Sequence, residues 1–306
     1  MTLSGETVPV DLPVATFGDL DAQRVAAAYP PMADHGPIRL VSVCLLTLNE
    51  EEHIGRSLDR LASLTIPGVD VDLHVADGGS TDATRQLVAD RGVDLITLED
   101  VLPSFGPVNG KGDSLWRAAS VLAGDAMVFL DADIDGDLAA AAQTLAAPVI
   151  AGANCHFVKG YFVRQRIPGV DPEMAGGRVT EQVARPLIAA MAPWLAFVHE
   201  PLSGQVAMSR AFAHQTAVVT GYGLEIGMLF DAVLTLGPDG VAEVDIGTIR
   251  NPSKPGDHLS RMGDEVGSTL VRRVTAFHHD PTFATAAEHL VVTELPERPP
   301  LRTVLD

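Results

Sequence analysis

The first half of the chain repeats one pattern, in which a short apolar run is followed by polar residues and then by apolar residues at helical spacing. The apolar runs predict four buried strands, at residues 38–48, 69–76, 93–98 and 126–130. Ile54, Leu58 and Leu61 recur at helical spacing after the first run. Strands that alternate with helices are typical of a parallel, doubly wound α/β sheet with helices on both faces.

Polar residues mark where these helices are expected to begin. Asn49 is expected to cap the first helix, and the acids at 50–52 suit the positive end of its dipole. Ser80 or Thr81 is expected to begin the second helix, and residues 115–122 are expected to be helical.

The second half of the chain is less regular. Its predicted elements are a strand at 157–164, a helix at about 179–191, a turn and helix at 221–236, a strand at 241–249 and a helix at 259–277. The tail, PERPPLRTVLD, is rich in proline and is predicted to be irregular. Residues 1–38 lack a clear period and are expected to form an N-terminal extension.

The composition is that of an ordinary globular chain, with 306 residues of which 46% are hydrophobic and 20% charged. A net charge of −19 opposes attraction to nucleic acid or to anionic membranes, so neither partner is expected. Cys44 and Cys155 lie in apolar surroundings, which favours buried thiols in a reducing compartment. Without a signal-peptide pattern or a membrane-spanning apolar run, we expect a cytoplasmic protein.

Three predicted strands end in polar clusters. These clusters are residues 47–50, residues 77–80 and residues 131–133. Because the carboxyl ends of parallel strands meet at one rim of the sheet, the three clusters are expected to lie together there, where doubly wound sheets bind ligands.

The sequence VFLDADID places acids at alternate positions, Asp131, Asp133 and Asp135, which would share one face of an extended strand. Such carboxylates suit a hard cation such as Mg²⁺ or Mn²⁺. The same acids could instead cap the following helix in a solvated turn. Asp135 and Asp137 are expected to cap the helix near Leu138.

Two other glycine-containing stretches have the composition of ligand-binding loops. Lys111, between Gly110 and Gly112 at a predicted helix start, could contact a phosphate, although a surface lysine fits the same pattern. The Walker spacing is absent. Asp77, before two glycines, could receive a base or ribose, or belong to an ordinary loop.

Six stretches taken together resemble a known family. In chain order they read LTLNEEEHIG, VADGGSTDAT, GKGDSLWRA, VFLDAD, GGRVTEQVARPL and GYGLEIGML. The chain resembles the retaining nucleotide-sugar glycosyltransferases of GT-A fold, and the last two stretches are similar to those of glucosyl-3-phosphoglycerate synthases. The similarity extends from about residue 41 to residue 266 and implies a mainly parallel, Rossmann-like sheet with an acceptor-binding C-terminal half.

The resemblance implies a transfer of glucose from a nucleoside diphosphate, UDP-glucose by analogy, to a hydroxyl of 3-phosphoglycerate with Mg²⁺ or Mn²⁺. It implies a donor site of Leu48, Glu50, Asp77, Lys111, Asp131, Tyr222 and Glu225. It implies an acceptor site of Gly177, Arg178, Thr180 and Ser253. Asp133 would bind the metal, and the catalytic group would be Asp133, Lys111 and Glu225.

The same resemblance divides the chain by function and implies a homodimer. Residues 39–135 would be the nucleotide-sugar-binding half and residues 136–256 the acceptor-binding half. Residues 257–306 would form a C-terminal helical segment and tail. In a retaining reaction, the departing phosphate oxygen could take the acceptor proton, so no carboxylate base is required.

The chain departs from the family pattern after its last predicted strand. Asn251 stands where the family usually has a metal-binding histidine, and Ser253 stands at the acceptor contact. Asn251 could offer an oxygen to a hard cation, and His258 could reach the metal only if the loop is rearranged. Pro252 replaces an often basic residue, so a nucleoside or another small polar alcohol is an alternative acceptor.

Other interpretations stay open on the sequence alone. Arg178 could pair with Glu181 or Glu173, and Glu225 with Lys159 or Arg164. A nucleotidyltransferase also uses such a sheet with acids and metal, but its glycine-rich basic signature is missing after the first strand. A nucleotide-sugar-binding module without transferase activity is the non-enzymatic alternative.

Overall fold

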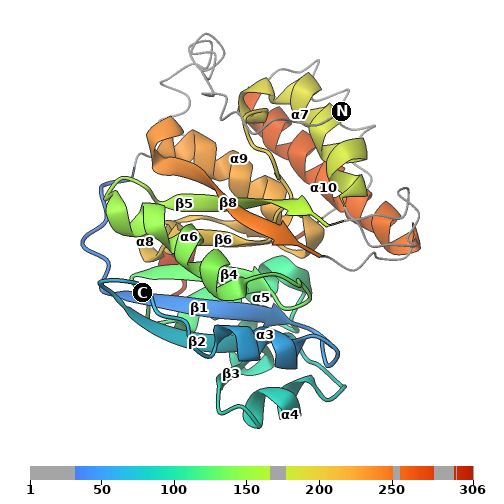
Figure 1. Ribbon diagram of the computed structural model, residues 1–306. Helices are drawn as coiled ribbons and strands as arrows, with labels where there is room; N and C mark the ends of the chain where they lie inside the picture. Colours follow the sequence, from blue (N-terminus) through green and yellow to red (C-terminus); the bar gives the residue numbers. More distant parts are fainter. Residues whose placement is uncertain (1–31, 166–176, 251–255, 279–292, 294, 306) are drawn as a thin grey trace.

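The computed structural model describes residues 32–165, 177–250, 256–278, 293 and 295–305. Its centre is a seven-stranded sheet in the order β3-β2-β1-β4-β6-β5-β8 (Figure 1). The strands are β1 (Leu40–Thr47), β2 (Asp70–Asp77), β3 (Asp94–Thr97), β4 (Ala126–Asp131), β5 (Phe157–Arg164), β6 (Val206–Ser209) and β8 (Val241–Ile249). The predicted, mainly parallel sheet is confirmed, because β1 to β4 run parallel and β8 runs parallel to β5.

The sequence pattern does not predict β6, which runs antiparallel to both of its neighbours, β4 and β5. The strand has four residues, and all are buried, so no alternation of polar and apolar side chains reveals it. Ala207 pairs with Val128 on one side and with Val158 on the other. β6 therefore joins the parallel first half of the sheet to β5 and β8.

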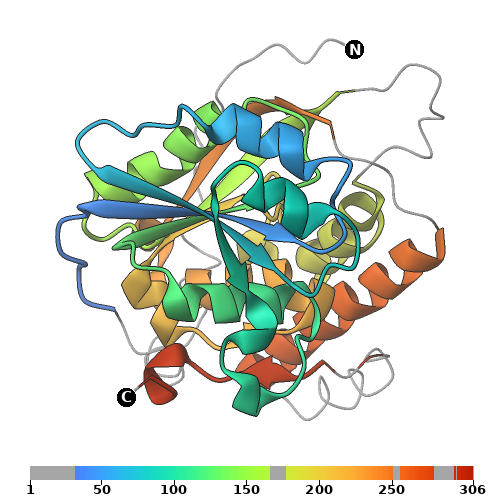
Figure 2. The same cartoon turned by 90° about the horizontal axis from the view of Figure 1, so that it is seen from below.

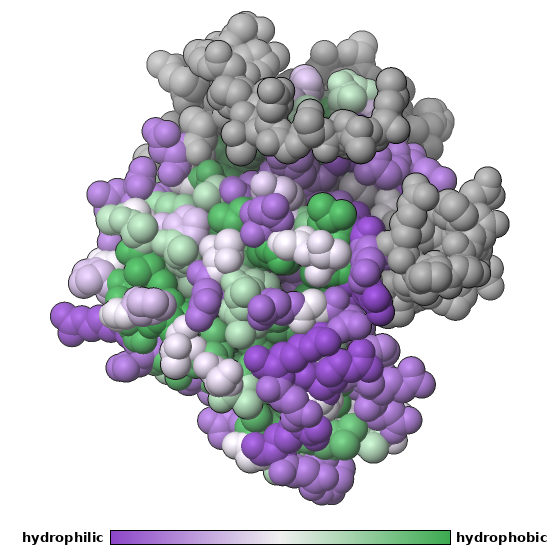
Figure 3. All heavy atoms as spheres, in the orientation of Figure 1, coloured by the Kyte–Doolittle hydropathy of each residue, from purple (hydrophilic) through white to green (hydrophobic). Residues whose placement is uncertain are grey.

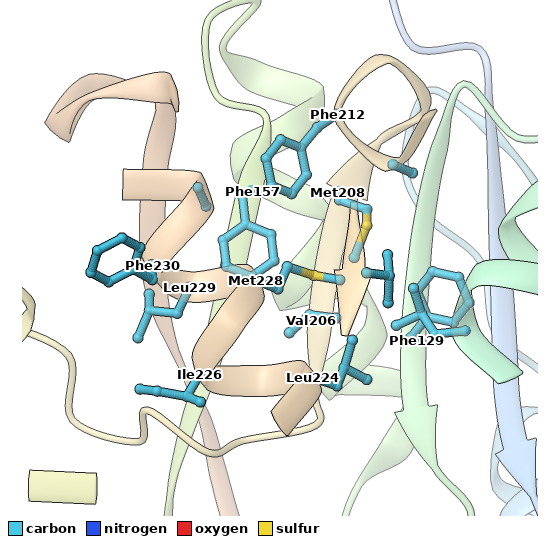
Figure 4. Close-up of a cluster of buried hydrophobic side chains, with 14 of the residues drawn as sticks. Phe129, Phe157, Val206, Met208, Phe212, Leu224, Ile226, Met228, Leu229 and Phe230 are labelled. Carbon is cyan, nitrogen blue, oxygen red and sulfur yellow. The ribbon is translucent and has the colours of Figure 1, made fainter. Parts of the chain in front are cut away.

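Helices cover both faces of this sheet, as Figure 2 shows. One face carries α3 (Ile54–Leu61), α4 (Thr84–Ala89) and α6 (Leu138–Ala151). The other carries α5 (Gly110–Val121) and α9 (Leu224–Leu236), and α10 (Gly256–His278) packs against α9. Each layer buries its own apolar core. The core around α9 includes Phe129 and Phe157 from the sheet and Phe230 from α9 itself (Figure 4), and burial of their apolar surface stabilises this layer.

The opposite core shows how α3 is held. Ile54 and Leu58 are buried in the same apolar cluster as Val43 and Leu45 of β1, whereas Arg56 on the same helix is half exposed. Figure 3 shows hydrophilic side chains gathered over α3 and α4 on this face of the molecule. α3 is thus an amphipathic helix whose apolar stripe faces the sheet.

The predicted cap by Asn49 and the predicted helix start at Ser80 or Thr81 are wrong. α3 begins at Ile54 and α4 at Thr84, and neither helix has a side-chain cap. Asn49 adopts a left-handed conformation (φ 57°), and its side-chain oxygen accepts a hydrogen bond from the Thr81 N–H at 2.8 Å. The Ser80 hydroxyl accepts from the Asn49 N–H at 2.8 Å, so these polar groups join the loops after β1 and β2 instead of starting helices.

The acids after β4 also separate into different roles. The strand ends at Asp131, so Asp133 and Asp135 lie in the following turn and not on one strand face with it. Asp137 caps α6 as predicted, by accepting from the Ala140 N–H at 3.0 Å. Asp135 does not act as the expected cap; its carboxylate pairs with Arg60 at 2.5 Å.

The C-terminal tail contains regular structure, contrary to the prediction. β9 (Glu297–Arg298) pairs antiparallel with β7 (Val218–Val219), and a 3₁₀ turn follows at Leu301–Thr303. Arg298 donates two hydrogen bonds to the buried Asp113 on α5, at 2.6 and 3.0 Å. These long-range contacts order the tail despite its prolines. Among the described helices, none combines the length and apolarity needed to cross a membrane.

Candidate active site

The predicted polar rim exists at the carboxyl ends of β1, β2 and β4. Thr47 at the end of β1 is in register with Asp77 at the end of β2, and Leu46 is in register with Asp131 at the end of β4. Two helix N-termini reach the same rim. Lys111 at the start of α5 contacts Asp131, and Glu225 at the start of α9 contacts Lys111.

Lys111 lies at the centre of the site, between two carboxylates. Its Nζ is 2.6 Å from Asp131 Oδ1 and 2.8 Å from Glu225 Oε1. Burial alone would lower the pKa of Lys111, but the negative charges of Asp131 and Glu225 outweigh burial and raise the pKa well above its usual range. Lys111 therefore stays cationic. It is the positive group beside Asp131. It is also the ion-pair partner of Glu225, whereas the alternatives considered from the sequence were Lys159 and Arg164.

A short loop before β6 fixes Asp131 from the other side. Gln205 Nε2 donates to Asp131 Oδ2 at 2.8 Å, and Gln205 Oε1 accepts from the Asp131 N–H at 3.1 Å. A side chain at Gly204 would overlap both the Lys111 ammonium and the Asp131 carboxylate. Sequence reasoning misses Gly204 and Gln205, because only the placement of β6 beside β4 brings this loop to the rim.

Glycines allow the two helix starts to touch. Gly110 and Gly221 both have positive φ, +75° and +70°, and a Cβ on Gly110 would lie 2.9 Å from the Gly221 Cα. A Cβ on Gly112 would overlap the carbonyl oxygen of Val219. The glycines around Lys111 and before Glu225 therefore permit close approach of two backbones, which brings these two side chains together.

A second lysine lies beneath this ion pair. Lys159 on β5 is only 1% exposed, and its Nζ donates to the Ser203 carbonyl oxygen at 2.7 Å. Burial lowers its pKa to about 8, although the nearby acid Glu225 opposes that shift. Lys111, Lys159, Gly204 and Glu225 form the polar part of a small hollow, whose apolar wall includes Phe157 and Met228.

Asp77 lies on the same rim, fully buried, and is held by donors from its own loop. Its carboxylate accepts from the N–H groups of Gly79 and Ser80 at 3.1 and 3.0 Å, from the Ser80 hydroxyl and from Arg85 Nε at 2.6 Å. Burial alone would raise the pKa of Asp77, but these hydrogen bonds, that of the Ser80 hydroxyl foremost, lower it below its usual 3.8. Asp77 thus shapes the loop that follows β2.

Replacing Asp77 with asparagine is expected to lower the free energy of unfolding near neutral pH by about 3 kcal/mol, because an amide NH₂ would face donors. Because the pKa of Asp77 is lower in the folded state, its carboxylate stabilises the fold at pH values above its pKa in the unfolded state. That stabilisation is lost as the pH falls through the pKa of the folded state. The difference between wild type and variant should therefore shrink below a pH of about 4. Urea unfolding at a series of pH values measures it, and a difference that grows in acid would contradict this account.

Two other predicted donor residues, Leu48 and Glu50, occupy the loop after β1. Leu48 is 56% exposed at the rim. The Glu50 N–H donates to Thr84 Oγ1 at 2.8 Å, and the Glu50 carboxylate lies 3.1 Å from His53 Nδ1. These contacts fix the loop against the start of α4, and the Leu48 side chain is exposed to solvent. Tyr222 lies across the rim, in the Gly221–Gly223 turn before α9.

The predicted acceptor residues lie where the chain enters α7 (Arg185–Met191). Gly177 has φ +93°, and Arg178 and the buried Thr180 follow it into the π-helical turn Thr180–Ala184. A helix start with an arginine is suited to an anion. Ser253 lies outside the described residues.

Neighbouring ion pairs correct one predicted partner on this side, Arg164. Glu181 pairs with Arg185 at 2.9 Å, and Glu173 lies outside the described residues. Arg164 donates to both oxygens of Glu200, which removes it as a partner for Glu225. The Arg164 guanidinium also lies against Gly177, where a Cβ would be 3.1 Å from its central carbon. This contact supports the turn that carries Arg178.

The structure limits how a metal could be held. Asn251 lies outside the described residues, and so does the side chain of His258 in α10. No cluster of three or more histidine, cysteine or acidic side chains suited to a metal occurs in the described part of the chain. Both oxygens of Asp131 already contact Lys111 or Gln205. Asp133 lies in the turn that follows β4, and a carboxylate is a ligand type that hard cations prefer.

Comparison with known proteins adds an independent view. Residues 42–134 match the family model described as glycosyl transferase family 2. The chain is 35% identical over 302 residues to glucosyl-3-phosphoglycerate synthase of Mycolicibacterium smegmatis, with 95% of each chain covered.

Solved structures of the Mycobacterium tuberculosis glucosyl-3-phosphoglycerate synthase share the fold. The complex with Mn²⁺, UDP and glucosyl-3-phosphoglycerate superposes with a TM-score of 0.72 at 29% identity, covering 99% of this chain and 98% of that one. The complex with Mn²⁺, UDP-glucose and phosphoglyceric acid gives 0.73 at 32% identity, with 93% and 94% covered. The expected GT-A fold is confirmed.

Proposed function

This chain belongs to the glucosyl-3-phosphoglycerate synthase family, and from this premise we propose that it transfers glucose from UDP-glucose to a hydroxyl of 3-phosphoglycerate with Mn²⁺ or Mg²⁺. The observation that carries the proposal is the cation Lys111, fixed at the rim between Asp131 and Glu225. A relative that is 35% identical over 95% of this chain supports it.

The residues of the site divide the work of recognition. Lys111 supplies fixed positive charge for a departing diphosphate, which is electrostatic catalysis at the charge that develops. Glu225 and Tyr222 bind hydroxyls of the hexose. Arg178 and Thr180, at a helix start, bind the anionic acceptor. A divalent cation, held by Asp133, would neutralise further charge on the diphosphate.

The proposed reaction retains the configuration of the sugar. The bond between the glucose anomeric carbon and the β-phosphate oxygen breaks, and a bond from that carbon to the acceptor oxygen forms. The acceptor proton goes to the departing phosphate, so no side chain has to act as its base. Glu225 binds the sugar and is not a nucleophile in this scheme.

The proposal extends to organisation and setting. Residues 39–135 form the nucleotide-sugar-binding half and residues 136–256 the acceptor-binding half. The protein acts as a homodimer in the cytoplasm and needs neither nucleic acid nor membrane. Two buried free cysteines support a reducing compartment, and the net charge of −19 opposes polyanion binding. Light scattering on the purified protein tests the dimer.

Donor and acceptor are tested separately. Isothermal titration with UDP, UDP-glucose and GDP-glucose, each with Mn²⁺, Mg²⁺ or EDTA, should give metal-dependent binding of UDP and UDP-glucose. UDP release is then measured with 3-phosphoglycerate, glycerol and a nucleoside as acceptors. Saturation with 3-phosphoglycerate supports the proposal. Saturation only with the nucleoside or glycerol would refute this acceptor.

Replacing Gly204 with alanine is expected to lower kcat/KM for UDP-glucose by about 10- to 100-fold, because a misplaced catalytic group loses rate steeply. The new methyl group would displace Lys111 and Asp131 from each other. Gly36→Ala is the matched control, since no heavy atom lies within 4 Å of the added carbon. Equal activity of the two variants in a steady-state assay would show that this contact has no role in catalysis.

A further inference from the structure

A buried carboxylate on α10 lies directly beneath the turn that carries Tyr222. Glu265 is only 1% exposed. Its Oε2 accepts a hydrogen bond from the Tyr222 N–H at 2.7 Å, and its Oε1 accepts from Arg261 Nε at 2.7 Å. Arg261 is 72% exposed, so its contribution is weakened by solvent, and the turn is the main buried partner of this carboxylate.

The turn is shaped around Glu265 and its neighbour one helical turn later. Gly221 has φ +70°, and any Cβ there would overlap Glu265 Oε2. The Thr269 hydroxyl donates to the Glu265 carbonyl oxygen at 2.8 Å and fills the space where a Cβ on Gly223 would lie. The two glycines of the GYG stretch are therefore matched to two polar side chains of α10.

The position of the carboxylate has an electrostatic consequence. The first N–H groups of a helix lack intrahelical acceptors and carry partial positive charge, which a nearby carboxylate stabilises. Glu265 supplies that carboxylate at the turn leading into α9, whose first turn carries Glu225. Glu225 in turn lies 2.8 Å from Lys111. A shift of the Gly221–Gly223 turn would thus move Tyr222 and Glu225 together.

We propose that Glu265 is a positioning residue for the donor sugar: it fixes the Gly221–Gly223 turn so that Tyr222 and Glu225 discriminate UDP-glucose from UDP. This inference rests on the proposed donor site, and it concerns the hexose rather than the acceptor. It assigns the discrimination to the length of the Glu265 side chain, since only a carboxylate or amide oxygen at that reach meets the Tyr222 N–H.

Two conservative variants separate length from charge. Glu265→Asp keeps the charge but withdraws the oxygen by one methylene, whereas Glu265→Gln keeps the reach and loses the charge. Asp231→Asn is the matched control, because Asp231 pairs with Arg273 at 2.9 Å across the same two helices, further from the turn. Isothermal titration with Mn²⁺ gives the affinity for UDP-glucose and for UDP in each variant.

We expect Glu265→Asp to weaken UDP-glucose binding about tenfold, which is the size of one lost hydrogen bond at a charged group. UDP binding should weaken by no more than about twofold. Glu265→Gln should stay within about threefold of wild type for both ligands. Asp231→Asn should lower the melting temperature without changing the ratio of the two affinities.

The inference is overturned if Glu265→Asp weakens UDP and UDP-glucose equally or leaves both unchanged. If Glu265→Asp does not fold, Glu265→Gln decides: an unchanged ratio of the two affinities supports positioning by side-chain reach, and a ratio changed more than about threefold overturns it. Because no acceptor is present, a wrong acceptor leaves this test intact. A wild type that binds neither nucleotide would instead reject the proposed donor, which distinguishes the two failures.

Discussion

Replacing Asp133 with alanine is expected to reduce glucose transfer by about a thousandfold, because the charge neutralisation supplied by a bound metal contributes several kcal/mol to the transition state. Both oxygens of Asp131 contact Lys111 or Gln205. By its place in the VFLDAD stretch, Asp133 is the carboxylate of the turn after β4 to which we assign the metal. The same change should make UDP affinity insensitive to EDTA.

The measurement pairs steady-state rates over a range of Mn²⁺ concentrations with titration of UDP. Asp135→Asn is the control from the same turn, since Asp135 pairs with Arg60 and takes no part in the proposed site. That control should keep its Mn²⁺ dependence. If Asp133→Ala retained a Mn²⁺-dependent rate near that of wild type, the assignment of the metal to Asp133 would be wrong.

Replacing Lys111 with methionine should lower kcat by about 100-fold, in the range seen when one preorganised electrostatic donor is removed from an active site. The variant leaves Asp131 and Glu225 facing each other without the cation between them. A loss of about 2 kcal/mol in the free energy of unfolding should accompany it, less than for a fully buried pair because Lys111 is partly exposed.

Rapid-quench single-turnover kinetics separate the chemical step from donor binding. Urea unfolding measures the stability of the variant. Lys159→Met is a useful comparison, because Lys159 is buried beneath the same hollow but donates to a backbone carbonyl, Ser203 O. The Lys159→Met variant should lose stability but retain more of the single-turnover rate than Lys111→Met does. A Lys111→Met enzyme with a wild-type rate in a single turnover would remove Lys111 from the mechanism.

Local sequence patterns were sufficient for much of this fold. The strand at Phe157–Arg164 and the helix at Leu224–Leu236 have clear periodicity or a defining glycine turn, and both agree with the structure. The common rim of Asp77 and Asp131 also followed from the pattern, because parallel strands place their carboxyl ends together.

Contacts between distant residues set the limit of that reasoning. Gln205 meets Asp131 only because β6 inserts beside β4, and a buried four-residue strand carries no periodic signal. Asn49 has the residue type of a helix cap, yet its side chain bonds to the loop after β2. The assignment of Glu225 to Lys111 likewise required the contact between Gly110 and Gly221, which no local pattern encodes.

The proposed reaction transfers glucose from UDP-glucose to 3-phosphoglycerate. Its most direct test is the ¹H NMR spectrum of a reaction with both compounds and Mg²⁺, recorded with and without EDTA. We predict one new anomeric signal with the small coupling of an α-linked glucose, which appears with UDP and is absent when EDTA is present. Release of UDP and free glucose without that signal, or a new signal with the large coupling of a β-linkage, would contradict it.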